Sequence, residues 1–216
     1  MTRLLLLCGL LASIVYVATD LAAAALFYPG YDYTAQQVSE LSAIGAPSRP
    51  FWMLLAYPYS LLTAAFGVGV WRAAGTRLLL RIAAALIVAF AANGFVWGLV
   101  APMHMRGTTF TASDSLHIAF AVAAVLLMLA FMVSGAIVLG RGFRIYTALT
   151  IAAMLAAGGI VGTQISAIAE NRPTPWMGLV ERISVYGPML WIAVFAVILA
   201  REATEDRPLA QVSPAP

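Results

Sequence analysis

Six apolar runs, each long enough to cross the hydrocarbon core of a bilayer, constrain this chain more than any other feature of its sequence. A bilayer offers no hydrogen-bond partner to a peptide group, so each run must fold as a helix that satisfies its own backbone. The sequence therefore predicts an all-α polytopic membrane protein, with a single six-transmembrane-helix bundle over residues 1–200. The expected spans are about 4–27, 51–71, 78–100, 117–139, 145–168 and 178–200.

The composition supports this class and excludes several others. Hydrophobic residues make up 62% of the 216 residues and charged residues 10%, whereas a soluble domain is roughly half apolar and a quarter charged. Every basic residue is Arg, which excludes a lysine Schiff base and a lysine-centred phosphate loop. The single Cys8 excludes an internal disulfide and a CxxC redox pair. The scattered Arg residues indicate membrane topology, and nucleic acid is not an expected partner.

The charges between the runs predict the orientation of the bundle. Basic residues favour the cytoplasmic side, so both termini are expected in the cytoplasm of a multi-pass cell-membrane protein. The first run could be taken for a signal peptide, but we expect it to be retained, because its removal would place the charged C-terminus outside. Residues 201–216 are charged and Pro-rich, which predicts a disordered tail. Eight Arg residues lie at the inner ends and four at the outer: Arg3, Arg72, Arg77, Arg81, Arg141, Arg144, Arg201 and Arg207 against Arg49, Arg106, Arg172 and Arg182.

The outer connecting segments are long, and long loops tend to carry function. In the first of them, residues 34–37 (TAQQ) fit a capping box that would start a short surface helix. Residues 111–114 (TASD) are a second capping signal, at the start of span four. Thr174 and Pro175 would open span six with Pro at the first helical position. The three long outer loops are 28–50, 101–116 and 169–177.

Polar residues of the spans gather in their outer halves, where each ionisable group is a functional-site hypothesis. Asp20 and His117 lie in these outer halves, whereas the inner halves of the spans hold almost nothing polar. We therefore predict a polar cavity in the outer half of the bundle, roofed by the long loops. A simple channel is not expected, because a transport path needs polar groups through its full depth. Five of these residues are expected to bind a ligand: Asn93, Trp97, Gln164, Glu181 and Arg182.

Asp20 needs a partner from another span, because no basic residue lies one or two turns away on its own run. Arg182 or Arg49 could reach it, or its carboxyl is protonated. For Glu181 and Arg182, pairing with neighbouring helices is the alternative to ligand binding.

Two histidines and a carboxylate form a candidate zinc site. Asp114 and His117 are one turn apart on one helix face, and with His104 they would leave one zinc position open. Two histidines thirteen residues apart are not a zinc signature, so interfacial or hydrogen-bonding histidines stay open as the alternative. Asp114 could also serve only to complement a helix N-terminus.

The same residues permit a metal-dependent hydrolase that acts on lipid. Glu40 or Asp20 would then act as the general base on a metal-bound water. Ser39 is a candidate nucleophile, although no GxSxG elbow surrounds it.

One polar phrase occurs twice, as LSAIGAPSRPFWM at residues 41–53 and as ISAIAENRPTPWM at 165–177. Both copies precede a span that carries a proline in its middle, Pro58 or Pro188. An internal repeat of the first and last outer hairpins is one interpretation. Coincidence in an Ala-rich sequence is the other. In either case the phrase is interpreted as scaffolding at the mouth of the cavity.

Four segments stand out together: YPGYDYTAQQVSELSAIGAPSRPFW at 28–52, APMHMRG at 101–107, SDSLHIAFA at 113–121 and GLVERISVYGPMLW at 178–191. With them the chain resembles the family called domain of unknown function 998, six-span proteins of bacteria and archaea. The resemblance covers about residues 5–200 and implies a six-helix membrane bundle with no established activity. By position, the family's characteristic polar residues correspond to Ser39, Glu40, His104, His117, Glu181 and Arg182.

Three functions stay open at this point. Binding of a membrane lipid or amphiphilic small molecule in the outward-facing pocket ranks first, because it needs only the one-sided polarity and the long loops. The lipid hydrolase, with zinc as the possible cofactor, ranks second, and a structural protein that docks a membrane partner ranks third. Small residues such as those at 158–162 (GGIVG) are expected to form close helix contacts, and a homo-oligomer could form through such faces.

Overall fold

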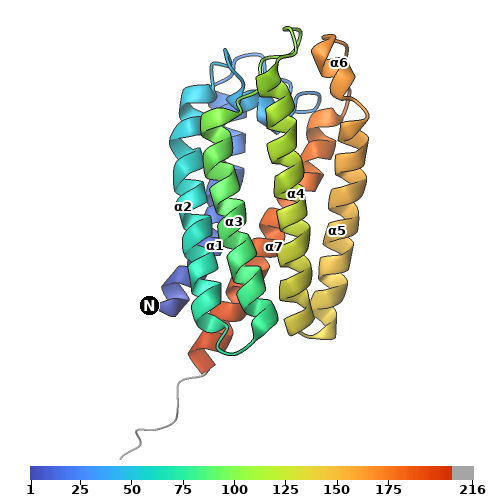
Figure 1. Cartoon of the computed structure of the whole chain (residues 1–216). Coiled ribbons are helices and arrows are strands. Elements are labelled where there is room, and N and C mark those ends of the chain that lie inside the picture. The colour runs from blue at the N-terminus through green and yellow to red at the C-terminus, as the bar shows by residue number, and fades with distance from the viewer. Residues whose placement is uncertain (206–216) are drawn as a thin grey trace, which may run out of the picture.

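Six long helices make up most of the described part of the chain, residues 1–205, in the computed structural model (Figure 1). The all-α six-helix bundle is confirmed: all six are long and apolar enough to cross a membrane, and residues 1–205 contain no strand. Residues 206–216, most of the predicted tail, lie outside the described part. The long helices are α1 (Thr2–Leu26), α2 (Arg49–Ala73), α3 (Leu78–Val100), α4 (Ala112–Val138), α5 (Arg141–Gly162) and α7 (Met177–Glu205).

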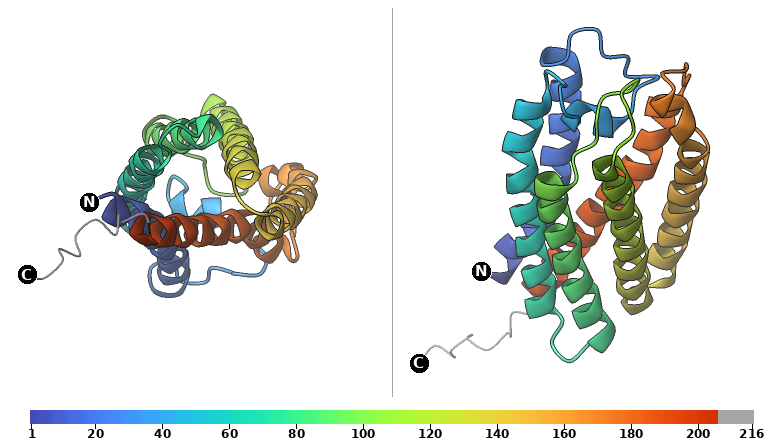
Figure 2. Two further views of the ribbon diagram at one scale, coloured as in Figure 1. Left: turned by 90° about the horizontal axis from the view of Figure 1, so that it is seen from below. Right: turned by 45° about the horizontal axis from the view of Figure 1, so that its top comes forward.

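The long helices stand in a ring, in which each contacts the next along the chain and α7 closes the ring against α1. The view along the axis shows this ring, with the short 3-10 helix η1 (Val38–Ser42) inside its outline (Figure 2). A second short helix, α6 (Ile165–Ala169), follows α5. We call the end with η1 and α6 the loop end, and the end where α1 begins and α7 finishes the terminal end (Figure 1).

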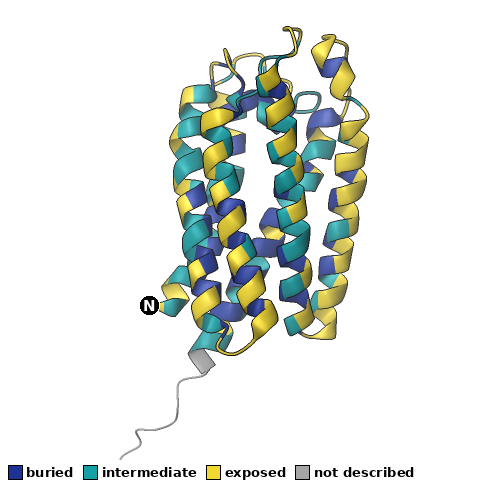
Figure 3. Cartoon of the chain, in the orientation of Figure 1, coloured by how far each residue is buried: buried dark blue, intermediate teal, exposed yellow. Residues whose placement is uncertain are grey.

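Exposed residues lie along the outside of the ring and buried ones toward its inside (Figure 3), and many of the exposed residues are large and apolar. Leu61 on α2 and Leu149 on α5 are examples of large exposed aliphatic side chains. A continuous exposed apolar surface of this kind indicates contact with lipid.

An apolar core fills the terminal half of the bundle. Phe66, Phe131, Trp191 and Phe195 are fully buried there, and the rings of Trp191 and Phe195 lie 4.7 Å apart. The indole N–H of Trp191 donates to Thr147 Oγ1 at 2.8 Å, so its one polar atom is satisfied inside the core. Close packing at this end leaves the loop half as the place for a cavity.

The predicted capping signal at residues 111–114 is confirmed, and it moves the start of α4 to Ala112. Thr111 Oγ1 accepts a hydrogen bond from the Ser113 amide at 3.2 Å, and Asp114 Oδ2 accepts one from the Thr111 amide at 2.9 Å. The predicted span began later, at residue 117, because the first turn of the helix is polar.

The capping box predicted at residues 34–37 is wrong in its position. The box starts at Gln37, whose amide donates to Glu40 Oε1 at 2.9 Å, and it opens a 3-10 helix. The amides of Thr34 and Ala35 donate instead to Asp32 Oδ1, which makes this segment a turn around an aspartate.

Three helix ends also differ from the prediction. Span five stops at Gly162, and the remaining apolar residues form α6. Span six begins at Met177, so Pro175 is not its first helical residue; Trp176 lies between them with a φ of 68°. The tail was predicted from Arg201, but α7 continues to Glu205.

The two copies of the repeated phrase adopt different structures. Residues 42–44 end η1 and enter a loop, whereas residues 166–168 lie inside α6. Pro58 and Pro188 do lie inside α2 and α7. The internal repeat stays a hypothesis.

A glycine permits a close contact between two helices, but it is not one of the glycines expected to do so. A Cβ at Gly69 would lie 2.8 Å from backbone atoms of Leu5 and Leu6, so α2 can approach α1 only with glycine at this position. At Gly158, Gly159 and Gly162 of α5, a Cβ would meet nothing within 4 Å. The prediction that residues 158–162 pack closely on a neighbouring helix of this chain is therefore wrong.

These two glycine environments predict opposite effects of a methyl group. Gly69→Ala should lower the free energy of unfolding by about 1–3 kcal/mol, because the new Cβ overlaps the α1 backbone. Gly158→Ala, the matched control, should raise it by about 0.5–1 kcal/mol, because alanine favours a helix and meets no neighbour. Unfolding curves in mixed detergent micelles measure both. Equal effects of the two substitutions would contradict the close contact of α1 with α2.

Candidate functional site

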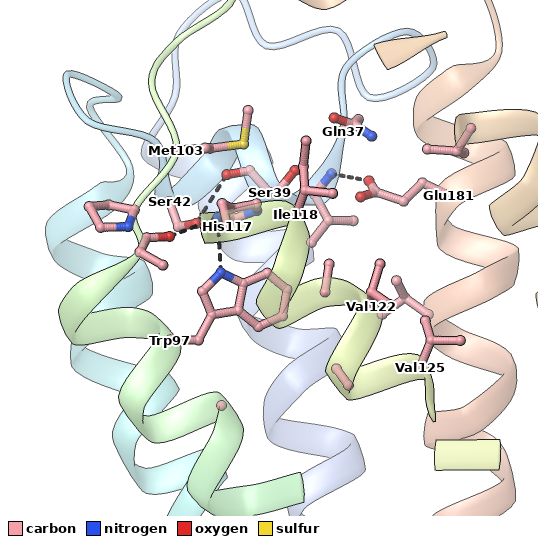
Figure 4. A pocket seen from close by; sticks show the side chains of 18 of the residues that line it. Gln37, Ser39, Ser42, Trp97, Met103, His117, Ile118, Val122, Val125 and Glu181 are labelled. Carbon is pink, nitrogen blue, oxygen red and sulfur yellow. Dashed lines mark hydrogen bonds between the residues drawn. The ribbon is translucent and has the colours of Figure 1, made fainter. Parts of the chain in front are cut away.

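The loop half of the bundle holds a cavity of about 620 Å³. All six long helices contribute to its walls, together with η1, residues 101–110 and α6. Phe90, Ala124 and Met189 line it and also belong to the apolar core, so they form its floor. Figure 4 shows the side toward the loops, where η1, His117 and Glu181 approach one another.

A buried ion pair joins the first and last spans beside this cavity. Arg182 donates from Nε and Nη2 to the two oxygens of Asp20, both at 2.8 Å, and the two residues are 3% and 0% exposed. Tyr186 donates its hydroxyl to the same carboxylate. Arg182 is therefore the partner of Asp20, and Arg49 is not. A carboxylate bound in this way has no free oxygen for the general-base role predicted for Asp20.

The same guanidinium fastens the first long loop to the bundle. Its Nη1 donates to the Tyr33 carbonyl at 3.0 Å, and it lies 3.5 Å from the centre of the Tyr33 ring. Tyr31 accepts a hydrogen bond from its Nη2 at 3.0 Å and donates to the Gln37 carbonyl at 2.7 Å. Burial raises the pKa of the Tyr31 phenol, which keeps this donor protonated. Arg182 does not line the cavity, and its described contacts join α7 to Asp20 and to the first long loop; its ligand-binding role stays a prediction.

A second ion pair ties the loops to one another. Arg106 donates to both oxygens of Glu40, at 2.7 Å and 2.6 Å, and its Nη1 donates to Thr174 Oγ1 at 3.2 Å. The hydrogen bonds that Arg106 donates to Glu40 raise the pKa of Arg106. Glu40 also accepts the Gln37 amide of the capping box. Its carboxylate is thus occupied, and it suits a link between three loops better than the predicted general base.

The predicted zinc ligands do not come together. Asp114 accepts the amide of His104 at 2.8 Å and lies 3.0 Å from its Nδ1, while it also caps α4. His117 is separate from this pair and contacts Trp97 and Ala101. Within residues 1–205 no group of three His, Cys, Asp or Glu side chains could hold a metal. The spacing of Asp114 and His117 suggested a shared site on one helix face. Asp114 instead binds the loop that precedes α4.

His117 lines the cavity, and its two ring nitrogens differ in their partners. Trp97 donates from Nε1 to His117 Nδ1 at 2.9 Å, and an indole N–H can only donate, so Nδ1 is then an acceptor and Nε2 carries the proton. Ala101 O lies 3.0 Å from the same Nδ1 and would accept its proton in the other tautomer. No described residue binds Nε2, which is therefore available to a ligand.

Two charged groups that line the cavity have no ion-pair partner among the described residues: Glu181 and Arg49. Glu181 accepts the amide of Val38, at the start of η1. Arg49 donates to the carbonyl of Ser42, at the end of η1. A carboxylate at the N-terminus and a guanidinium at the C-terminus both complement the dipole of this helix. The rise of about 2.0 Å per residue in a 3-10 helix places the two groups on the order of 8 Å apart.

The remaining predicted residues divide between the cavity and its surroundings. Asn93 donates to the Phe120 carbonyl at 3.3 Å from within the cavity wall. Sequence reasoning missed Ser42 and Arg49 as wall residues, although both belong to the motif that carried the family resemblance. Among predicted site residues, Ser39, Asn93, Trp97, His104, Asp114, His117 and Glu181 line the cavity, whereas Asp20, Glu40, Gln164 and Arg182 do not.

Comparison with known protein families places this chain in one of them. The family model described as "Protein of unknown function (DUF998)" matches residues 10–198, which reach from the first span into the last. No curated protein and no solved structure matched the chain significantly.

The buried pair of Asp20 and Arg182 predicts an asymmetric response to substitution. Arg182→Leu strands a carboxylate without water and should cost about 3–5 kcal/mol of unfolding free energy. Asp20→Asn should cost less, because the carbonyls of Tyr33, Gln36 and Gly178 still receive the guanidinium. Thermal unfolding in detergent ranks the variants.

The double variant Asp20→Asn/Arg182→Leu is the control for this prediction. It should be more stable than Arg182→Leu alone, because no charge is left unpaired. A double variant no better than the single one would show that the ion pair is not what the loss of Arg182 removes.

Proposed function

Since the chain belongs to the DUF998 family of proteins of unknown function, we propose that this integral membrane protein binds one lipid or amphiphilic small molecule in its loop-end cavity. A volume of about 620 Å³ falls within the range of ligand pockets, roughly 300–1,000 Å³. The orientation predicted by the Arg distribution, with both termini in the cytoplasm, would open this site toward the outer side of the cell membrane.

The polarity gradient of the cavity wall carries the proposal. Ser39 and Ser42 of η1 line the cavity at the loop end, and His117 lies beside them (Figure 4). The floor of Phe90, Ala124 and Met189 is apolar. An amphiphile placed with its polar head at η1 and its tail toward the core would match both ends, whereas a fully polar ligand would leave the floor unmatched.

The two unpaired charges indicate the chemistry of the head. Arg49 has five N–H donors, of which one donates to protein, and its planar fork suits a phosphate or carboxylate. Glu181 points into the cavity with one oxygen bound to Val38 (Figure 4); its other oxygen would accept from an ammonium or hydroxyl group. The head group would therefore carry an anion toward Arg49 and a donor toward Glu181, with His117 Nε2 beside them.

The metal-dependent hydrolase is not proposed for this site. Its candidate bases, Asp20 and Glu40, are each engaged by an arginine, and its three metal ligands do not meet. No described side chain hydrogen-bonds Ser39 Oγ, so nothing would activate it as a nucleophile.

Native mass spectrometry of the detergent-purified protein tests the proposal. The parent should retain one lipid, and Arg49→Gln/Glu181→Gln should weaken its binding about tenfold or more, because a charge-assisted hydrogen bond contributes about 1.5–3 kcal/mol. Glutamine can still bind Ser42 O or the Val38 amide, so η1 keeps its caps.

The matched control is Arg172→Gln/Glu170→Gln. It removes one exposed ion pair, Arg172 Nε to Glu170 Oε2 at 2.6 Å, outside the cavity wall. The control should retain the lipid like the parent. A parent that carries no lipid, or equal retention in all three proteins, would overturn the proposal.

A further inference from the structure

The ring of helices is closed unevenly. α3 packs along α4, and α7 packs on both α5 and α1, but α4 and α5 contact each other only sparsely. α4 and α5 are also the least buried spans: 17% and 22% of their most apolar windows are buried, against 50% for α7. In two views they meet at their connecting turn and diverge toward the loop end (Figures 1 and 2).

We call the boundary between α4 and α5 the seam. Among the long helices, only α4 and α5 carry exposed residues that line the cavity. On α1, α2, α3 and α7, every described residue that lines the cavity is buried or half-buried. On α4, Val122 and Leu126 line the cavity and are 53% and 61% exposed; on α5, Leu155 lines it and is 47% exposed. A side chain that belongs both to the cavity wall and to the outer surface marks an opening between the two.

Glycines widen this opening on the α5 side. Gly158, Gly159 and Gly162 line the cavity, are exposed, and would place a Cβ in open space. Other span glycines, such as Gly67 on α2 and Gly135 on α4, are in contact with neighbouring side chains. An added Cβ at any of the three on α5 would meet no described atom within 4 Å, so these positions leave space beside α5.

The position and the chemistry of the seam indicate its occupant. It lies within the spans, between apolar lips, where the surrounding medium is the hydrocarbon of the bilayer. We propose that the ligand of the cavity is an acyl lipid that moves in sideways from the bilayer between α4 and α5, and whose chains lie in this seam. The inference rests on the proposed function, because it gives the ligand class and the path for the same cavity.

An alternative path exists at the loop end. Thr108, Thr109 and Phe110 line the cavity and are exposed there, so a ligand from water would pass them. A bulky side chain at the seam would block only the path from the bilayer, and one at the loop end only the path from water. Substitution at each place therefore distinguishes the two paths.

Photo-crosslinking with a lipid that carries a diazirine at its acyl end tests the path. The lipid is delivered to proteoliposomes, and samples are irradiated briefly at increasing times after delivery. The labelled peptides are identified by mass spectrometry. Labelling at the floor residues Phe90 and Met189 is divided by labelling at Leu149, which faces the bilayer outside the cavity. This ratio reports occupation of the cavity independently of lipid delivery.

Gly158→Trp/Gly162→Trp places two indoles in the seam, one turn apart. The rate of floor labelling should fall about tenfold, the factor that an added barrier of about 1.4 kcal/mol gives. The matched control is Ala152→Trp/Ala156→Trp, with the same spacing on exposed positions of α5 that do not line the cavity. It should label like the parent. Gly158→Leu/Gly162→Leu, a smaller obstruction, should give an intermediate rate if the tryptophan variant does not fold.

The failures of the two proposals are distinguishable. Floor labelling that persists unchanged in both obstructed variants would overturn the seam and leave the lipid site intact. Loss of labelling in Thr108→Trp/Thr109→Trp, with no change in the seam variants, would place the path at the loop end and overturn the seam as well. No floor labelling in the parent would overturn the lipid site itself.

Discussion

The ion pair between Asp20 and Arg182 is the interaction on which the loop half of this protein depends. It joins the first and last spans, which are distant in the sequence, and so closes the ring at that end. Two charges without water are costly unless every donor is satisfied, and here carbonyls of the first loop complete the set. Successive residues on a helix point about 100° apart, so fixing Arg182 toward Asp20 directs its neighbour Glu181 elsewhere, into the cavity (Figure 4).

The two halves of the bundle are built differently. Aromatic residues fill the terminal half, whereas the loop half surrounds a cavity under a cap of loops that Arg106 and Glu40 connect. Protein interiors are close-packed, so a cavity of this size is the part of the bundle that can hold a ligand. A bound amphiphile would contact both its polar and its apolar walls, and for this reason the proposed function is assigned to the loop half.

The spans were predictable because long apolar runs leave a bilayer protein one backbone solution. The sequence narrowed the partner of Asp20 to Arg182 or Arg49, because few basic residues lie at a similar depth in the membrane. Arg182 is the partner. The pairing of Glu40 with Arg106 was not predicted, since they lie in two different connecting segments and the sequence does not show how these segments pack on each other. The zinc site failed for the same reason: Asp114 binds the loop before it. The close packing expected of the GGIVG glycines inside the bundle was wrong, because a small residue in the sequence does not show which face of its helix meets a neighbour. Whether these glycines form a homo-oligomer stays a prediction.

A structure determined in a lipid nanodisc, with a rigid binder on the loop end to aid particle alignment, tests the central claim most directly. The account predicts an elongated density that starts between Arg49 and Glu181, reaches toward Phe90 and Met189, and leaves the protein between α4 and α5. Side chains of α4 and α5 that close together and fill the space, with no density between them, would contradict it.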